Sequence, residues 1–378
     1  MTLPLLELPA SLNYVGVFLS LECNLACSYC INDPEQAGRR EILFPIQAKS
    51  RRKSLTPDEW VQALNRIPFR QDLPLTLQGG EPMLYWNSKG LDIILAQTPH
   101  YYDLLTNFAL KPEVFVKNLQ GMQHKFQREA PYPSIRVSYH AEEMNRVWQG
   151  RGFAELVDRC EALGKLGFKV SPDKAHSDVG IYMVAHPQNQ LTAEMQALYA
   201  GRVPFETKEF LGVHEGQLHG HYLYPYSTDL IARQLHPQTL SCECRTTELL
   251  VDPLGFVWGC HYYLYQSWVA GGPLKQFEQL EKHGFRYAQN QSKIFTGMAP
   301  VGHLLDADFS MADLQVFRPC HEYGRCIGCD TKVKNDRFQS YYDHGIAHTS
   351  VQIRNIQMPV SLQKNIPELA QLRQFFSE

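Results

Sequence analysis

The chain has 378 residues, of which 44% are hydrophobic and 20% charged, and its formal net charge is −3. That composition supports a sizeable hydrophobic core, and the small net charge excludes a general affinity for nucleic acid or anionic membranes. No apolar run reaches the length of a membrane span, and the N-terminal residues lack the basic start and apolar core of a signal peptide. We therefore expect a cytoplasmic protein without a membrane partner.

Apolar segments that end in polar residues alternate with helical patterns through the first part of the chain. The helical pattern from Leu55 to Ile67 opens with Thr56 as N-cap, Pro57 at the first helical position and Glu59 closing a capping box. Two further helices are predicted within residues 153–167 and 191–201. Strands are predicted within residues 14–23, 73–82, 101–110, 132–143, 179–189 and 203–213.

This alternation predicts an α/β fold with a parallel sheet and helices outside it. Six units in roughly 210 residues suit a partial (β/α)6 TIM-like barrel, whose chemistry lies at the C-terminal ends of the strands. We expect this barrel to span residues 1–235. A small C-terminal α+β extension, a β-hairpin plus helix, would follow at residues 236–340, and a tail and helix at residues 341–378.

Nine of the ten cysteines fall into two groups. In a cytoplasmic chain such groups indicate metal ligands or catalytic thiols rather than disulfides. The exception, Cys160, lies in the helical pattern 153–167, where a buried and inert thiol is expected.

The first group has three cysteines on one loop after the first predicted strand, namely Cys23, Cys27 and Cys30. A closed structural zinc site needs four ligands, whereas three thiolates suit three corners of a [4Fe–4S] cluster and leave one iron open. The CxxxCxxC spacing and its position after the first strand resemble the radical S-adenosylmethionine (radical SAM) family. The resemblance implies that S-adenosylmethionine completes the cluster and that the backbone around Tyr29 meets its adenine.

A second motif, Gln78-Gly79-Gly80-Glu81-Pro82, follows the second predicted strand and resembles the GGEP motif of the same family. Two glycines permit close approach of the backbone to a ligand. The resemblance implies that this motif binds the amino group of the methionyl moiety, and that the Glu81 carboxylate supplies the negative charge for this ammonium. The alternative is an ordinary glycine turn with a solvated glutamate.

Three further contacts to S-adenosylmethionine are implied at the ends of the third and fourth strands. Asn107 stands where the family often has TNG, although Phe108 here replaces the glycine, and Ser138 and His140 end the fourth strand. For each of the three polar residues, an ordinary loop role is an equal alternative.

The second cysteine group includes a predicted hairpin, in which TELLV and FVWGC flank the turn DPLG and bring Cys244 near Cys260. The group resembles the SPASM/twitch extension of radical SAM enzymes. Its first half matches closely, but its second half lacks the opening cysteine, where Phe317 stands, and the last cysteine. The resemblance therefore implies one auxiliary [4Fe–4S] cluster. We expect its ligands to be Cys244, Cys260, Cys326 and Cys329, with Cys242 and Cys320 as alternates. A structural zinc site is the competing interpretation.

The resemblance implies an enzyme that reductively cleaves S-adenosylmethionine to a 5′-deoxyadenosyl radical, which abstracts a hydrogen atom from substrate. It also implies a flavodoxin or ferredoxin type electron donor. The substrate that the resemblance favours is a ribosomally made peptide, which the enzyme would modify during its maturation. Oxidation, epimerisation or rearrangement of a sugar or nucleoside is the alternative, and a non-enzymatic Fe–S or zinc binding protein is a second one.

Overall fold

The computed structural model describes residues 3–10, 12–27, 54–85, 90–210, 212–214, 217–219, 240–246, 248–261, 264, 300–323 and 351–357. The described strands are β1 Tyr14–Ser20, β2 Leu75–Gly79, β3 Tyr102–Thr106, β4 Ile135–Tyr139, β5 Val179–Ala185, β6 Phe205–Glu209, β7 Gly212–His214, β8 Gln217–His219, β9 Leu240–Thr246, β10 Glu248–Val251, β11 Phe256–Trp258, β12 Gly302–His303, β13 Arg318–Tyr323 and β14 Val351–Gln357. The described α-helices are α2 Pro57–Leu64, α4 Leu91–Gln97, α5 Pro112–Leu119, α6 Ala141–Val147, α7 Gly152–Ala162 and α8 Ala193–Tyr199. Short 3₁₀ helices are η1 Pro82–Leu84, η2 Gln123–Lys125, η3 Leu163–Leu166, η4 Lys174–His176 and η7 Met311–Gln315.

The main sheet has nine strands in the order β12-β11-β10-β1-β2-β3-β4-β5-β6. Strands β1 to β6 pair in parallel and in chain order, which confirms the six predicted strands and the parallel sheet. Within the described residues the edge strands β12 and β6 do not pair with each other, so this part of the chain forms an open sheet.

The three helices predicted in the first part of the chain are also confirmed, as α2, α7 with η3, and α8. Helix α2 begins with the Thr56 side chain accepting a hydrogen bond from the backbone N–H of Glu59, and the Glu59 carboxylate accepts one from the Thr56 N–H in return. In α7 the Cys160 thiol is fully buried, and burial raises its pKa, so it is inert as predicted. None of the described helices has the length and apolar composition needed to cross a bilayer.

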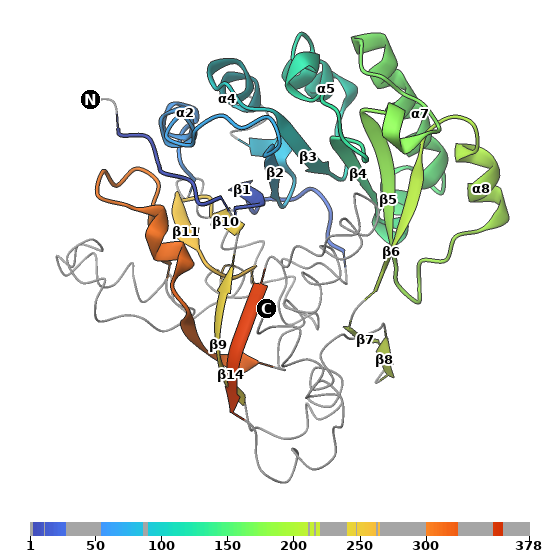
Figure 1. Cartoon of the computed structure of the whole chain (residues 1–378). Helices are drawn as coiled ribbons and strands as arrows, with labels where there is room; N and C mark the ends of the chain where they lie inside the picture. The colour runs from blue at the N-terminus through green and yellow to red at the C-terminus, as the bar shows by residue number, and fades with distance from the viewer. Residues whose placement is uncertain are drawn as a thin grey trace.

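The two faces of the parallel strands differ sharply in polarity. The helices lie along one side of the curved sheet (Figure 1), and the strand residues packed with them are apolar. These residues include Val15, Val17, Leu75, Leu77, Leu104, Ile135, Val137, Val179 and Ile181. The alternate residues face the other side and are largely polar. They include Thr76, Gln78, Asp103, Arg136, Ser138, Tyr182 and Glu206.

A buried charge cluster occupies the start of this polar face. The Asp103 carboxylate pairs with Arg128 at 2.6 Å and with Arg136 at 3.2 Å, and it accepts a hydrogen bond from the Tyr132 hydroxyl. Both guanidinium groups also lie over the Tyr132 ring. Arg128 and Tyr132 precede β4, so the cluster braces the strand beginnings, opposite the edge where chemistry is expected.

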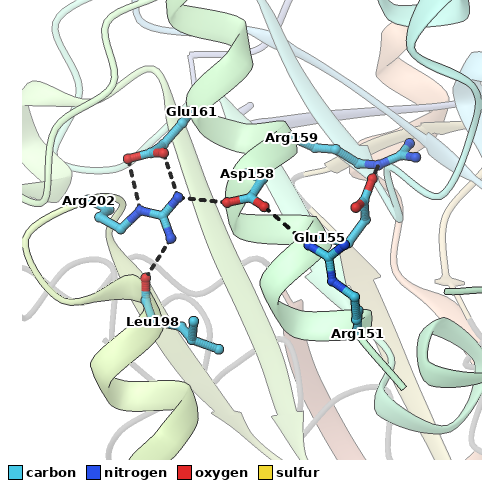
Figure 2. A network of polar contacts seen from close by, with 7 residues as sticks. All are labelled: Arg151, Glu155, Asp158, Arg159, Glu161, Leu198 and Arg202. Carbon is cyan, nitrogen blue, oxygen red and sulfur yellow. Dashed lines mark hydrogen bonds and ion pairs between the residues drawn. The ribbon is translucent and has the colours of Figure 1, made fainter. Parts of the chain in front are cut away.

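A second polar network joins α7 to the turn after α8 on the outer surface. The Arg202 guanidinium contacts both oxygens of Glu161, one oxygen of Asp158 and the Leu198 carbonyl (Figure 2). The side chains are partly exposed, so this network stabilises the fold only modestly.

The predicted hairpin forms, but it lies in the main sheet rather than apart from it. Strands β10 and β11 are antiparallel, and Gly255 in their turn has φ +90°, a conformation that favours glycine. Strand β10 then pairs in parallel with β1, with Tyr14 opposite Glu248. The hairpin therefore extends the main sheet beyond β1.

A separate three-stranded antiparallel sheet has the order β13-β9-β14. Strand β14 comes from the segment expected to be a tail, and it pairs with β9 at positions such as Ile353 opposite Cys244. The tail therefore contributes a strand to this sheet. The C-terminal helix predicted within residues 341–378 lies outside the described residues.

Asp252 gives the hairpin turn a pH dependence. Its carboxylate accepts hydrogen bonds from the Leu254 and Phe256 N–H groups and from the Trp258 indole, yet burial raises its pKa to about 7. A raised pKa means that the folded state binds this proton more tightly than the unfolded state. The stability that results is complete below the ordinary pKa of 3.8 and is lost as the pH rises through about 7.

We predict that the free energy of unfolding of the wild type, measured relative to that of Asp252→Asn, decreases as the pH is raised from 4 to 7. The amide in the variant does not titrate, so the change reports on Asp252. Urea unfolding of both proteins across this range measures the difference. A difference that stays constant or grows with pH would contradict the assignment.

Candidate functional site

The predicted site residues of the first four strands come together at one edge of the sheet. Because β1 to β4 are parallel, their C-terminal ends lie side by side. The described site residues at this edge are Cys23, Cys27, Gly79, Gly80, Glu81, Pro82, Asn107, Ser138 and His140. Tyr29 and Cys30 lie outside the described residues.

The two glycines let the end of β2 pack directly on the loop that carries the cysteines. The Gly80 N–H donates to the Ser20 carbonyl at 2.9 Å, and the Glu81 N–H donates to the Glu22 carbonyl at 2.7 Å. A Cβ on Gly80 would lie 2.2 Å from the Glu22 carbonyl oxygen, and one on Gly79, which has φ +134°, would lie 2.1 Å from the Ser20 carbonyl oxygen. These glycines are therefore required by contact between two chain segments, before any ligand is considered.

Glu81 is fully buried and its carboxylate points into the protein. One oxygen accepts from the Thr106 hydroxyl at 2.7 Å and the Met83 N–H at 3.0 Å, and the other accepts from the Asn107 N–H at 2.7 Å. Burial raises the pKa of Glu81 to about 7 despite these donors. The carboxylate thus joins the ends of β2 and β3, and its contact with a ligand ammonium stays a prediction. Pro82 follows as the first residue of η1.

Asn107 connects the end of β3 to the cysteine loop. Its Nδ2 donates to the Asn24 Oδ1 at 2.9 Å and to the Cys23 Sγ at 3.5 Å, while its Oδ1 accepts from the Ala109 N–H at 2.8 Å. Asn24 in turn donates to the Ala109 carbonyl at 2.8 Å. The Asn107 amide therefore has internal partners on every side, and its predicted contact with S-adenosylmethionine stays a prediction.

Phe108 stands where the related motif has glycine, and it adopts the conformation that glycine favours, with φ +57°. Such a conformation costs a non-glycine residue about 1–2 kcal/mol. The Phe108 side chain is fully buried and stacks on Phe115 with ring centroids 3.9 Å apart, so apolar burial offsets this strain.

Glu143 is a site residue that the sequence did not indicate. Its carboxylate accepts from the Ala26 N–H at 3.0 Å, between Cys23 and Cys27, and pairs with Arg146 at 2.8 Å. Glu143 lies in α6, three residues after His140. The helix that follows β4 thus also contacts the cysteine loop. This pairing spans 117 positions, and no local pattern predicts it.

Ser138 lies in β4, and His140 follows β4 as the N-cap of α6. Ser138 lies opposite Tyr182 of β5 in the sheet, and the Ser138 and His140 side chains are partly exposed. Burial lowers the pKa of His140 to about 4, so its imidazole is neutral at pH 7. A neutral imidazole both donates and accepts a hydrogen bond, which suits a role beside a polar ligand.

The C-terminal cysteines are described in part. The backbone register places Cys320 of β13 opposite Cys242 of β9, and Arg318 opposite Cys244. Cys260 follows β11, which lies between β12 and β10 in the main sheet. Cys326 and Cys329 lie outside the described residues, so the predicted ligand set is not tested as a whole.

The donor chemistry of the first cysteine loop fits an iron–sulfur cluster. Cys23 and Cys27 are half-buried, and the Cys23 sulfur accepts from the Leu25 N–H at 3.4 Å as well as from Asn107. Amide N–H groups directed at sulfur favour the thiolate that binds iron. Within the described ranges no three possible metal ligands cluster, and Cys30 lies outside those ranges.

Comparison with known proteins yields no family model and no curated protein that matches the chain. Solved structures that are similar to it include two of one protein. Streptococcus suis SuiB bound to precursor peptide SuiA has 11% identity and a TM-score of 0.36, covering 84% of this chain and 77% of that one. SuiB bound to S-adenosylmethionine has 12% identity and a TM-score of 0.33, covering 82% and 76%. At TM-scores this low, no inference about this chain follows from the likeness.

We predict that Gly80→Ala destabilises the fold by about 1–3 kcal/mol, the usual range for overpacking, and lowers the iron content of the reconstituted protein. Its Cβ would displace the Glu22 carbonyl and with it the cysteine loop. Thermal unfolding and iron analysis measure the two effects.

Gly164→Ala is the matched control, because Gly164 is exposed and the nearest atom to an added Cβ is 3.8 Å away. This variant should not lower the thermal stability or the iron content. Equal behaviour of the two variants would contradict the packing role of Gly80.

Proposed function

We propose that this protein is a radical SAM enzyme. Cys23, Cys27 and Cys30 would bind a [4Fe–4S] cluster, and S-adenosylmethionine would complete it. The observation that carries the proposal is the hydrogen bonding among the three motifs. Glu81 of the glycine motif anchors Asn107, and Asn107 donates to Cys23 of the cysteine motif. An ordinary glycine turn with a solvated glutamate would not be expected to form these two hydrogen bonds.

The chain's own residues would bind and orient the reactants. When bound and reduced, the cluster supplies one electron for cleavage of S-adenosylmethionine to methionine and a 5′-deoxyadenosyl radical, which abstracts hydrogen from substrate. Glu81 has a pKa of about 7, so an ammonium nearby would favour its ionised form. The neutral His140 would offer a hydrogen bond without adding charge. The tightly packed strand ends would exclude water from the reacting atoms.

The substrate class follows from the resemblance to SPASM/twitch enzymes, and maturation of a ribosomally made peptide is our first proposal. A sugar or nucleoside is the alternative. A flavodoxin or ferredoxin in the cytoplasm would donate the electron. A neighbouring gene for a short precursor peptide would favour the peptide, and neighbouring sugar or nucleoside genes would favour the alternative.

We predict that replacing Cys23, Cys27 and Cys30 together with Ala abolishes 5′-deoxyadenosine formation and removes about half of the iron, because one of two [4Fe–4S] clusters loses its thiolates. Anaerobic reconstitution, iron analysis and chromatography of the products measure both. A triple variant that still forms 5′-deoxyadenosine would disprove the assignment. A wild type that forms none under strong reductant would instead support a non-enzymatic metal protein.

The second cysteine group would hold one auxiliary [4Fe–4S] cluster. The predicted ligands are Cys244, Cys260, Cys326 and Cys329, with Cys242 and Cys320 as alternates. The backbone register that places Cys320 opposite Cys242 supports a part for both alternates. Four protein thiolates would leave no iron open to substrate, so the cluster would pass an electron or brace the extension.

We predict that the triple variant retains about four irons per chain, together with an iron–sulfur absorption band, because the auxiliary site is intact. In that background, Cys242→Ala with Cys320→Ala should lose this iron if the alternates are ligands. Zinc in place of iron, or no metal at all, would contradict an auxiliary cluster.

A further inference from the structure

We propose that Asn107 is a positioning residue that raises the reduction potential of the cluster at Cys23, through an N–H···S hydrogen bond. The inference rests on the proposed function, because it needs a cluster on the first cysteine loop. It assigns Asn107 a role toward the cluster sulfur rather than toward S-adenosylmethionine.

The orientation of the Asn107 amide is determined by its neighbours. The Ala109 backbone N–H is only a donor, so the atom that accepts its hydrogen bond must be the Asn107 oxygen. The Ala109 carbonyl is only an acceptor, so Asn24 directs its nitrogen there and its oxygen toward Asn107. Both conditions turn the Asn107 NH₂ group toward Asn24 and the Cys23 sulfur, at 2.9 and 3.5 Å.

The residue is also held in place along the backbone. The Asn107 N–H donates to the buried Glu81 carboxylate at 2.7 Å, and only 5% of Asn107 is exposed. With the amide oxygen and both amide hydrogens engaged, the side chain has little freedom to turn away from the sulfur. Glu81 therefore supports the N–H···S contact from behind.

A hydrogen bond to a ligand sulfur stabilises the more negative state of a cluster. Reduction of a [4Fe–4S] cluster adds one electron and increases the negative charge on its sulfurs. An N–H donor therefore favours the reduced state and raises the potential. The Leu25 N–H contributes to the same sulfur at 3.4 Å, but as a backbone group it is not removed by substitution.

The experiment is an EPR-monitored redox titration of the reconstituted full-length protein, following the signal that changes when S-adenosylmethionine is added. Asn107→Leu has similar volume and no donor, and Asn107→Asp has the same shape but adds an anion. We expect Asn107→Leu to shift the potential negatively by about 59 mV, a tenfold change for a one-electron couple. Asn107→Asp should shift it further in the same direction.

Asn24→Ala is the control for loosening of the loop. It removes the contacts of Asn24 with Asn107 and Ala109 but leaves the Asn107 N–H available to Cys23. We expect its potential to stay near that of the wild type. An equal shift in Asn24→Ala and Asn107→Leu, or no shift in either Asn107 variant, would overturn the inference.

Loss of the cluster in both Asn107 variants would show a purely structural role and would also overturn it. Failure of the proposed function is distinguishable from all of these outcomes. In that case the wild type itself would show no EPR signal that responds to S-adenosylmethionine.

Discussion

The buried carboxylate of Glu81 is the constraint on which the arrangement of the site depends. A carboxylate with no exposed surface must find donors inside the protein, because leaving it unpaired would cost several kcal/mol. Here the donors are the Met83 N–H after β2 and two groups at the end of β3, Thr106 and Asn107. The two strand ends are thereby held together, and the glycines before Glu81 allow the same segment to touch the cysteine loop.

The cysteine loop is hydrogen-bonded to residues of two other elements, and these contacts need no metal. Asn107 at the end of β3 donates to Asn24 of the loop, and Glu143 of α6 accepts from the Ala26 N–H of the loop. Such support orients ligands before the metal binds. Phe108 shows how tightly the region is packed, since it tolerates a left-handed backbone in return for full burial against Phe115.

The polarity of the sheet explains how the chain combines a stable core with a site. The strand residues that pack on the helices are apolar and supply the hydrophobic core. The alternate residues are polar, and the Asp103 cluster braces their beginnings while Ser138 and His140 lie toward their ends. One period-two pattern thus separates an apolar face, which forms the core, from a largely polar face of the same strands.

Local features of this protein were determined by the sequence alone. The six parallel strands, the capping box of α2, the buried thiol of Cys160 and the glycine turn of the β10–β11 hairpin all depend on residues a few positions apart. Short-range periodicity, caps and turns are sufficient to predict such features. The motifs at the strand ends belong with them, because parallel strands bring their C-terminal ends to one edge.

Only the tertiary structure decided which distant groups meet. Strand β10 lies beside β1, Cys320 lies opposite Cys242, and Glu81, Asn107 and Glu143 direct their polar groups to specific atoms of the cysteine loop. These pairings span tens to hundreds of residues, and many registers satisfy the same local pattern equally well. They are selected by packing of the whole core and by the need to pair every buried polar group, which are properties of the folded chain.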